Sequence, residues 1–400
     1  MAAITSGAAD FIWLDCILNS TSAVLGSDVC GYITAQAERE TPDTSGFVIS
    51  FMHMSIVEKG WNILMSFSVQ ILRMSSFQLV LHLTIGLMFI SNASDARESP
   101  KTTIYVDKSG SGNYSSVQEA INSVPDNNDQ WIRIVVKPGT YDEKVNIPLA
   151  KQYIFLQGES HKTTTIRHWD AGNASTAATF QLYADNFAAS DITFQNSYSI
   201  KKGEINTTRI TWAPAALIEG DKVSFRRCAF HGIQDTLADM KGRHYFEQCF
   251  ISGAIDFIWG HGQSVYEDCL VMTIANYIGW DGYVTAQGRE GANQPSGFVF
   301  KSGRVIGEGR TYLGRAWRRY SRVLFHETSM SNVVVPEGWS SWTFQGHEDD
   351  ITFAEVGCKG EGAGDSRRVK WMKHLSPQEL EHLLSNSFVN KEGWIEAQPS

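Results

Sequence analysis

The 400-residue sequence contains little proline and little cysteine, and its basic residues are outnumbered by its acidic ones. Only 10 prolines occur against 34 glycines, which indicates many tight turns in a folded chain. The six cysteines form no CxxC pair and no Cys/His zinc pattern, so the sequence predicts no metal site and no cofactor. The formal net charge of −9 argues against a general nucleic-acid-binding protein.

Three cysteines and two aspartates recur at nearly equal intervals. Cys228, Cys249 and Cys269 are separated by 21 and then 20 positions, and Asp235 and Asp256 by 21. A period of ~20–25 residues is typical of solenoids, in which equivalent positions stack on neighbouring coils. The two aspartates should then lie about 5 Å apart along the strand-pairing direction, too close for both to ionise freely. The three cysteines should form an interior ladder or a disulfide.

Short apolar runs separated by glycine-containing or polar turns continue through residues 102–356. Strands this short, without long helices between them, favour an all-β parallel β-helix with short terminal helices over a doubly wound sheet. A β-sandwich or a barrel remains an alternative. Ser115 with Gln118 predicts a capped N-terminal helix, and Ser376-Pro377-Gln378-Glu379 predicts a capped C-terminal helix.

Residues 1–64 repeat part of the central sequence in the same order. The matching segments are AADFIW at 8–13 with AIDFIW at 254–259, GYITAQAERE at 31–40 with GYVTAQGRE at 282–290, and SGFVIS at 45–50 with SGFVFK at 296–301. This stretch contains Asp10, which corresponds to Asp256, but no counterpart of Asp235. We interpret residues 1–64 as a partial duplicate produced by a gene-model or fusion artefact; a second half-site is the alternative.

Residues 65–96 have the layout of a secretory signal peptide. A basic Arg73 precedes an apolar run from Phe77 to Ile90, and small residues follow at Ala93, Ser94 and Ala96. The run is ~14 residues long, which is short for a stable membrane span, and a buried pair of core strands is the alternative. We therefore expect residues 97–400 to form the mature, secreted domain, with glycosylation sequons at Asn113, Asn173 and Asn206.

Five segments of this domain together resemble the signature segments of the plant pectin methylesterases (pectinesterases). They are GTYDE (139–143), GIQDTL (232–237), GAIDFIWG (253–260), YVTAQGRE (283–290) and YLGRAW (312–317), in the order of that family. The resemblance implies a right-handed parallel β-helix. It also implies hydrolysis of the methyl esters of homogalacturonan to pectate and methanol at a site without a metal.

The resemblance also implies roles for individual residues. Asp256 matches the nucleophile and Asp235 the general acid and base, while Gln234 matches a donor to the oxyanion. Arg315 is expected to lower the pKa of Asp256, and the charge on Asp256 to raise that of Asp235. Trp317 matches the ring that packs beside the sugar.

Phe257 and Trp259 are further candidates for lining the cleft, with stacking in the solenoid core as the alternative. A buried structural ion cluster is the alternative for Asp235, Asp256 and Arg315. Tyr141 and Glu143 in GTYDE are expected to stabilise the N-terminal coils.

The sequence departs from the family pattern at three positions. The segment TWAPAALIEGD (211–221) has Trp212 near the place where a glutamine usually supplies an oxyanion donor, and it contains no glutamine. Ala316 replaces the usual proline, and Trp259 replaces the common phenylalanine. We also expect no inhibitor-like pro-region before the catalytic domain. The missing glutamine keeps open a catalytically weak or silent pectin-binding β-helix as the alternative function.

A pectate lyase on the same fold is a third hypothesis, but the sequence has no acidic cluster for calcium. For the pectin methylesterase we expect location in the cell wall or apoplast, pectin as partner, a protein inhibitor as a further candidate partner, and a monomeric state.

Overall fold

The structure is a computed structural model of the whole chain, and it divides into two units, Met1–Asp95 and Ala96–Ser400. It describes positions 97–400 except 202, 203 and 206, together with the backbone of five strands between positions 3 and 67. These five strands pair antiparallel in sequence order: β1 (Ala3–Ser6), β2 (Phe11–Asn19), β3 (Val29–Glu38), β4 (Val48–Glu58) and β5 (Trp61–Phe67).

The N-terminal sequence echo thus takes an antiparallel arrangement, whereas its counterpart between positions 254 and 301 lies in parallel sheets. Its interpretation as a partial duplicate stays a prediction. The signal-peptide-like stretch beyond Phe67 lies outside the described residues, as does the sequon at Asn206. In the part of the chain that the structure describes, no helix has the length and apolar character needed to cross a bilayer.

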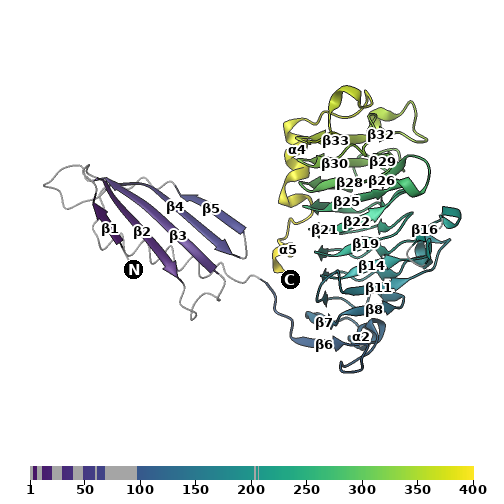
Figure 1. Cartoon of the computed structure of the whole chain (residues 1–400), viewed down its shortest axis with the longest axis horizontal. Helices are drawn as coiled ribbons and strands as arrows, with labels where there is room; N and C mark the ends of the chain where they lie inside the picture. Colours follow the sequence, from purple (N-terminus) through teal and green to yellow (C-terminus); the bar gives the residue numbers. More distant parts are fainter. Residues whose placement is uncertain are drawn as a thin grey trace. The chain divides into compact units, whose positions relative to one another are not determined.

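The second unit is built from three parallel sheets whose strands alternate in the sequence, so that successive coils extend each sheet (Figure 1). The first sheet has ten strands: β6 (Thr102–Val106), β7 (Ile132–Val136), β10 (Ile154–Gly158), β13 (Phe187–Ser190), β18 (Val223–Arg226), β21 (Arg243–Glu247), β24 (Gln263–Glu267), β27 (Gly297–Lys301), β30 (Arg322–His326) and β33 (Thr352–Val356).

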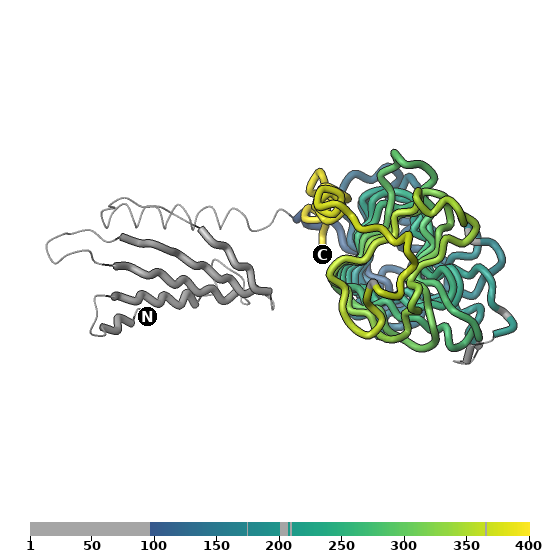
Figure 2. The backbone as a smooth tube through the Cα atoms, turned by 90° about the horizontal axis from the view of Figure 1, so that it is seen from above, coloured from purple at the N-terminus to yellow at the C-terminus, as the bar shows by residue number. Residues whose placement is uncertain are grey.

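The second sheet has eight strands: β8 (Gly139–Asp142), β11 (Thr164–His168), β14 (Thr193–Asn196), β19 (Ala229–His231), β22 (Phe250–Gly253), β25 (Leu270–Ile274), β28 (Arg304–Glu308) and β31 (Ser329–Met330). The third sheet also has eight: β9 (Val145–Ile147), β12 (Phe180–Leu182), β17 (Ala216–Ile218), β20 (Leu237–Asp239), β23 (Ile258–Gly260), β26 (Gly282–Gln287), β29 (Thr311–Ala316) and β32 (Trp339–Ser340). A short hairpin, β15 (Ile200–Lys201) and β16 (Glu204–Ile205), protrudes from one connection. The expected parallel β-helix is confirmed, and its coils superimpose around a common axis in Figure 2.

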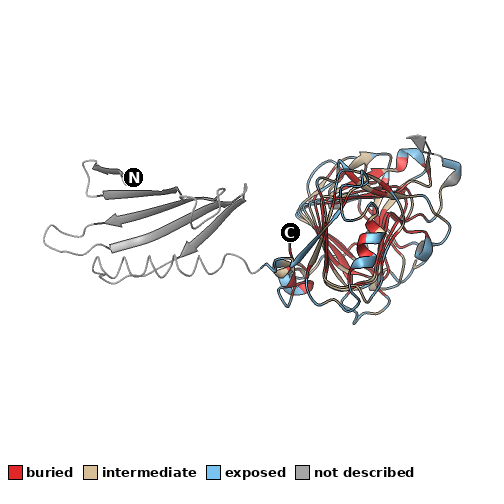
Figure 3. Ribbon diagram, turned by 90° about the horizontal axis from the view of Figure 1, so that it is seen from below, coloured by how far each residue is buried: buried red, intermediate tan, exposed pale blue. Residues whose placement is uncertain are grey.

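Stacked aromatic rings fill the interior along the first sheet. Phe225, Phe246, Tyr266, Phe300 and Phe325 occupy the same register on successive strands. Their ring centroids are 5.4, 4.6, 4.5 and 4.3 Å apart, and the rings of each neighbouring pair are nearly parallel. Figure 3 shows these inward-facing strands as buried. Because each ring covers the one below, the core is continuous from coil to coil.

The cysteines beside this aromatic row are free thiols. Cys228, Cys249 and Cys269 are buried, and none of them is in a disulfide. The sulfurs of Cys249 and Cys269 lie 3.3 and 3.5 Å from the carbonyl oxygens of Phe225 and Phe246 on the preceding coil. Of the two arrangements expected, the interior ladder is therefore the correct one.

Helix α2 (Val117–Ser123) packs against the first coils. Its N-cap is Ser116, whose side chain accepts a hydrogen bond from the backbone of Glu119, and not Ser115 as the sequence predicted. Glu143 accepts further hydrogen bonds from the backbone N–H groups of Val117 and Gln118, both at 2.9 Å. These bonds satisfy the first N–H groups of the helix, which agrees with the stabilising role expected for Glu143.

Helix α4 (Pro377–Leu384) has the predicted capping box between Ser376 and Glu379. Its Leu383 is buried in an apolar cluster with Val265, Val299 and Leu324 of the first sheet. The helix therefore covers the outer face of this sheet. Two further helices are single turns, α3 (Ala174–Ala177) and α5 (Trp394–Ala397).

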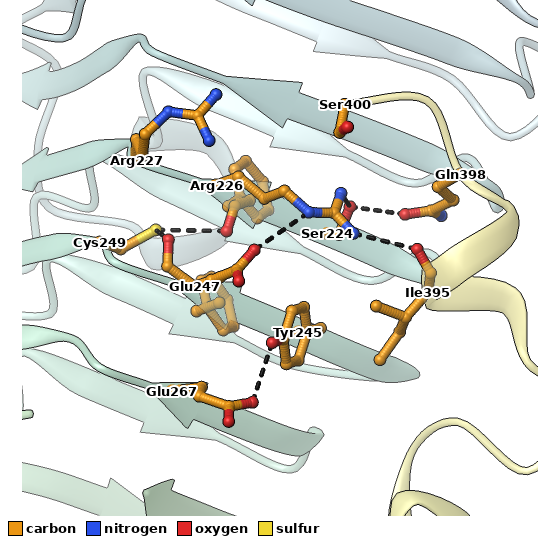
Figure 4. A network of polar contacts seen from close by, with 12 residues as sticks. Ser224, Arg226, Arg227, Tyr245, Glu247, Cys249, Glu267, Ile395, Gln398 and Ser400 are labelled. Carbon is orange, nitrogen blue, oxygen red and sulfur yellow. Dashed lines mark hydrogen bonds and ion pairs between the residues drawn. The ribbon is translucent and has the colours of Figure 1, made fainter. Parts of the chain in front are cut away.

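The C-terminal tail is hydrogen-bonded to the outer face of the first sheet (Figure 4). The Gln398 side chain accepts a 2.5 Å bond from Ser224 and donates to the Lys222 carbonyl at 2.7 Å. Arg226 donates to the Ile395 carbonyl at 3.0 Å and lies 3.2 Å from Glu247. The tail thus shields Ser224 and Arg226 from solvent and also provides them with hydrogen-bond partners.

We predict that Gln398→Ala lowers the free energy of unfolding by about 1–3 kcal/mol, because it leaves the buried Ser224 hydroxyl hydrogen and the Lys222 carbonyl without their partner. Denaturant unfolding measures the change. Gln378→Ala, at an exposed position of α4, is the matched control and should change stability by less than about 0.5 kcal/mol. Equal effects of the two substitutions would contradict the prediction.

Candidate active site

The two aspartates lie in equivalent turns that connect the second sheet to the third. Gln234 and Ile255 form an isolated parallel bridge, and the Asp235 backbone N–H donates to the Ile255 carbonyl at 3.0 Å. Asp235 and Asp256 have φ angles of 61° and 46°. This left-handed conformation costs free energy for most residues but is tolerated by aspartate. The repeat spacing therefore places both carboxylates on adjacent coils, as predicted.

Arg315 approaches Asp256 from β29, two coils further along the third sheet. Its Nε and Nη2 donate to the two oxygens of Asp256 at 2.7 and 2.5 Å. Asp256 and Asp235 are each only 7% exposed, so both carboxylates are mostly shielded from solvent. The bidentate geometry fixes the orientation of the Asp256 carboxylate as well as balancing its charge.

Burial and mutual repulsion determine the protonation of the two aspartates. Burial, with the added charge of Asp256, raises the pKa of Asp235 to about 8. Burial also raises the pKa of Asp256, although the hydrogen bonds and charge of Arg315 oppose that increase. Arg315 thus lowers the pKa of Asp256 as expected, but desolvation is the larger effect, so the pKa lies above its ordinary value. At neutral pH the cluster favours a protonated Asp235 beside an Asp256 held by a guanidinium.

Two aromatic rings that sequence reasoning missed flank Arg315. The guanidinium carbon is 3.7 Å from the Trp342 ring centroid and 4.3 Å from that of Tyr283. Tyr283 lies in the YVTAQGRE segment, one coil before Arg315, so the repeat spacing could have identified it. Trp342 lies in the loop after β32 and has no periodic signal. These cation–π contacts help to hold the guanidinium beside Asp256.

A second aromatic cluster lies beside Asp235. The Trp259 indole N–H donates to the Asp235 carbonyl at 3.2 Å, and its ring packs edge-on against Trp317 with centroids 5.2 Å apart. His261, which the sequence did not single out, also packs against Trp317, with a centroid distance of 4.7 Å. A Cβ at Gly288 would lie 2.6 Å from the Trp317 ring, so a side chain there would displace it. Trp259 and Trp317 are both half-buried and thus accessible to a ligand.

Two other candidate positions differ in their environment. Phe257 is 0% exposed and packs in the main hydrophobic core, so it cannot line a cleft; core stacking is its role. Gln234 is half-buried, and within the described residues its side chain has no hydrogen-bond partner. Trp212 is 51% exposed, and its correspondence to the usual glutamine stays a prediction.

The cluster of Asp235, Asp256 and Arg315 combines an anion, an acid and a fixed cation. A carboxylate anchored by arginine beside a protonated carboxylic acid can attack an electrophilic carbon and protonate the leaving group. Among the residues that the structure describes, no group of three or more His, Cys, Asp or Glu side chains could hold a metal ion.

Comparison with known proteins identifies the family. The family model described as Pectinesterase matches residues 103–392. Two Arabidopsis thaliana proteins, Probable pectinesterase 29 and Probable pectinesterase 55, are 47% and 46% identical to this chain. The matches cover 74% and 76% of this chain and 89% and 92% of the two relatives.

Solved structures show the same fold. The pectin methylesterase from carrot is 30% identical with a TM-score of 0.68, covering 74% of this chain and 95% of the carrot protein. The pectin methylesterase from Aspergillus niger, at 24% identity, has a TM-score of 0.64 over 76% of this chain and 98% of its own. With this family match, these identities and this shared β-helix, the chain belongs to the pectinesterase family.

Proposed function

We propose that this pectinesterase removes methyl esters from homogalacturonan at the cluster of Asp235, Asp256 and Arg315. The observation that carries the assignment is the asymmetry of the two aspartates. Arg315 holds Asp256 at 2.7 and 2.5 Å, while the pKa of Asp235 is raised to about 8. One carboxyl group is thereby suited to act as an anion and the other as an acid.

In the proposed acylation step, a carboxylate oxygen of Asp256 attacks the ester carbonyl carbon. The resulting oxyanion accepts a hydrogen bond from the side-chain amide of Gln234. Collapse of this intermediate breaks the carbon–oxygen bond to the methoxy group, which takes the proton of Asp235 and leaves as methanol. An anhydride between Asp256 and the uronate remains.

In the second step, Asp235, now ionised, accepts a proton from a water molecule that attacks the uronate carbonyl carbon. The anhydride bond breaks, which releases the free uronic acid and restores the Asp256 carboxylate. Arg315 does not exchange protons in either step. It keeps the Asp256 carboxylate oriented, and the Tyr283 and Trp342 rings keep Arg315 in place.

The half-buried rings of Trp317 and Trp259 are suited to the apolar C–H faces of the sugar units. One protein that shares the fold is a pectin methylesterase in complex with a hexasaccharide, and we extend this kind of ligand to the present chain. We also propose that this protein acts in the cell wall, where pectin is found, and that a protein inhibitor binds it.

The first test is methanol release from methylated pectin by the full chain. We expect Asp256→Asn to abolish release, because the amide cannot form the anhydride, and Gln234→Ala to lower kcat by about 10²–10³. Asp281→Asn, at a partly exposed carboxylate paired with Arg310, is the matched control and should retain activity. If the wild-type chain released no more methanol than Asp256→Asn, a silent pectin-binding protein would be favoured instead, in line with the exposed Trp212 in place of glutamine.

The second prediction concerns the pH dependence of kcat/KM. Because Asp235 must be protonated for acylation, activity should fall as the pH rises through about 8. It should also fall at low pH as Asp256 becomes protonated. Arg315→Lys removes the bidentate contact that opposes the raised pKa of Asp256. The acidic limb of the pH profile, where activity falls at low pH, should therefore move to higher pH.

Arg310→Lys is the control for this substitution, since Arg310 also contacts an aspartate, Asp281, at 2.9 and 3.3 Å, but at an exposed site. An acidic limb that is identical in the two lysine variants would contradict the role of Arg315.

The third prediction concerns the ring that covers Arg315. Trp342→Ala should lower kcat/KM by about 2- to 30-fold, because a cation–π contact contributes ~0.5–2 kcal/mol. Trp342→Phe should retain most of the activity. Tyr105→Ala, which removes an exposed ring on the first coil, should have no effect. An unchanged kcat/KM in Trp342→Ala would contradict the role of the ring.

A further inference from the structure

A polar hollow lies on the outer face of the second sheet, formed by strands β11, β14, β19, β22 and β25 with the hairpin connection at Ile200. Its volume is about 520 Å³, within the range of ligand pockets, which is ~300–1,000 Å³. The side chains that give it its chemical character are Lys162, Thr165, Gln195, His231 and Ser252. None of these is a residue of the candidate active site.

Part of this hollow is already held rigid by hydrogen bonds within the protein. His231 Nδ1 lies 2.9 Å from the Ser252 hydroxyl, and Thr193 donates to the His161 carbonyl at 2.6 Å. Burial lowers the pKa of His231 to about 4, so its ring is neutral at neutral pH. A neutral imidazole with Nδ1 occupied offers Nε2 as one further polar group.

Other polar groups of the hollow have no protein partner. Among the described residues, the Lys162 ammonium, the Gln195 amide and the Thr165 hydroxyl make no side-chain hydrogen bond or ion pair. Among the lining residues that the structure describes, there is a cation, Lys162, but no acidic residue, although the whole chain carries a net charge of −9. This local exception favours a ligand that is anionic and rich in hydroxyl groups.

Three of the polar groups are arranged in a row along the solenoid axis. Gln195, His231 and Ser252 are register partners on β14, β19 and β22, so they repeat with the coil spacing of ~4.8 Å. Ile200 and Ile274 add apolar surface, which suits the C–H face of a sugar ring. A linear acidic polysaccharide lying along the axis matches both the row and the charge.

We propose that this hollow is a second, non-catalytic site that binds de-esterified uronate units of a pectic chain. The uronate carboxylate pairs with Lys162, and the ring hydroxyls form hydrogen bonds with Gln195, Thr165 and His231. The inference rests on the proposed function, because the ligand is the product of the proposed reaction. A protein that holds its own product at a second surface would stay on the polymer after each turnover.

The test compares the full-length protein with its Lys162→Ala/Gln195→Ala variant. Affinity for unesterified oligogalacturonate, measured by calorimetry at low salt, should fall by about tenfold, since a hydrogen bond to a charged group is lost. The rate of methanol release from a short methylated oligomer should be unchanged, whereas KM on long, partly de-esterified pectin should rise. Lys359→Ala, at an exposed lysine on a terminal coil, controls for the loss of one charge.

Equal oligogalacturonate affinity in the wild type and the double variant, or an equal loss in Lys359→Ala, would overturn the inference. These outcomes are independent of catalysis, because binding is measured without turnover. Absence of methanol release from the wild type would count against the proposed function alone.

Discussion

The backbone hydrogen bonds between neighbouring coils determine where the functional side chains of this protein lie. The bond from the Asp235 N–H to the Ile255 carbonyl and the bond from the Leu237 N–H to the Phe257 carbonyl, at 3.0 and 2.9 Å, hold two turns in register. The same ladder pairs Arg315 with Ala286, which in turn pairs with Trp259. Arg315, distant from Asp256 in the sequence, therefore reaches it without any long loop. A one-residue shift in this ladder would turn alternate side chains to the opposite face and separate the charges.

The interior of the β-helix also contains a buried polar network, and a glycine makes room for it. Asp239, at the end of β20, lies 2.5 Å from His244 Nδ1 and accepts a 2.6 Å bond from the Tyr266 hydroxyl, and all three residues are essentially fully buried. A Cβ at Gly262 would lie 2.0 Å from the Asp239 carboxylate, so glycine is required at that position. His244 Nε2 lies 2.8 Å from the Gly220 carbonyl, so every polar side-chain atom of the trio has a partner. These bonds offset the desolvation of the carboxylate. They also tie β20, the strand that follows Asp235, to β21 and β24 of the first sheet.

Much of the fold and part of the site could be predicted from the sequence. The equal spacing of Asp235 and Asp256 predicted their place on adjacent coils, and the repeat of the cysteines predicted their place inside. The predictions failed for residues whose role depends on how deeply their side chains are buried. Phe257 belongs to the same short motif as Asp256, yet its side chain is in the core, because successive residues of a turn can point to opposite sides. The net direction of the Asp256 pKa likewise could not be predicted, since a sequence contains the arginine partner but not the extent of burial.

Spacing and composition along the chain are enough to predict the period of the solenoid, the family and the types of residue available for chemistry. Which of those residues share an environment depends on the tertiary structure. It placed Trp342 and Tyr283 against Arg315, and it aligned Gln195, His231 and Ser252 on the outer face of the second sheet. The physical reason is that burial and electrostatic coupling depend on distances in space, and residues from different coils acquire those distances only when the sheets pair.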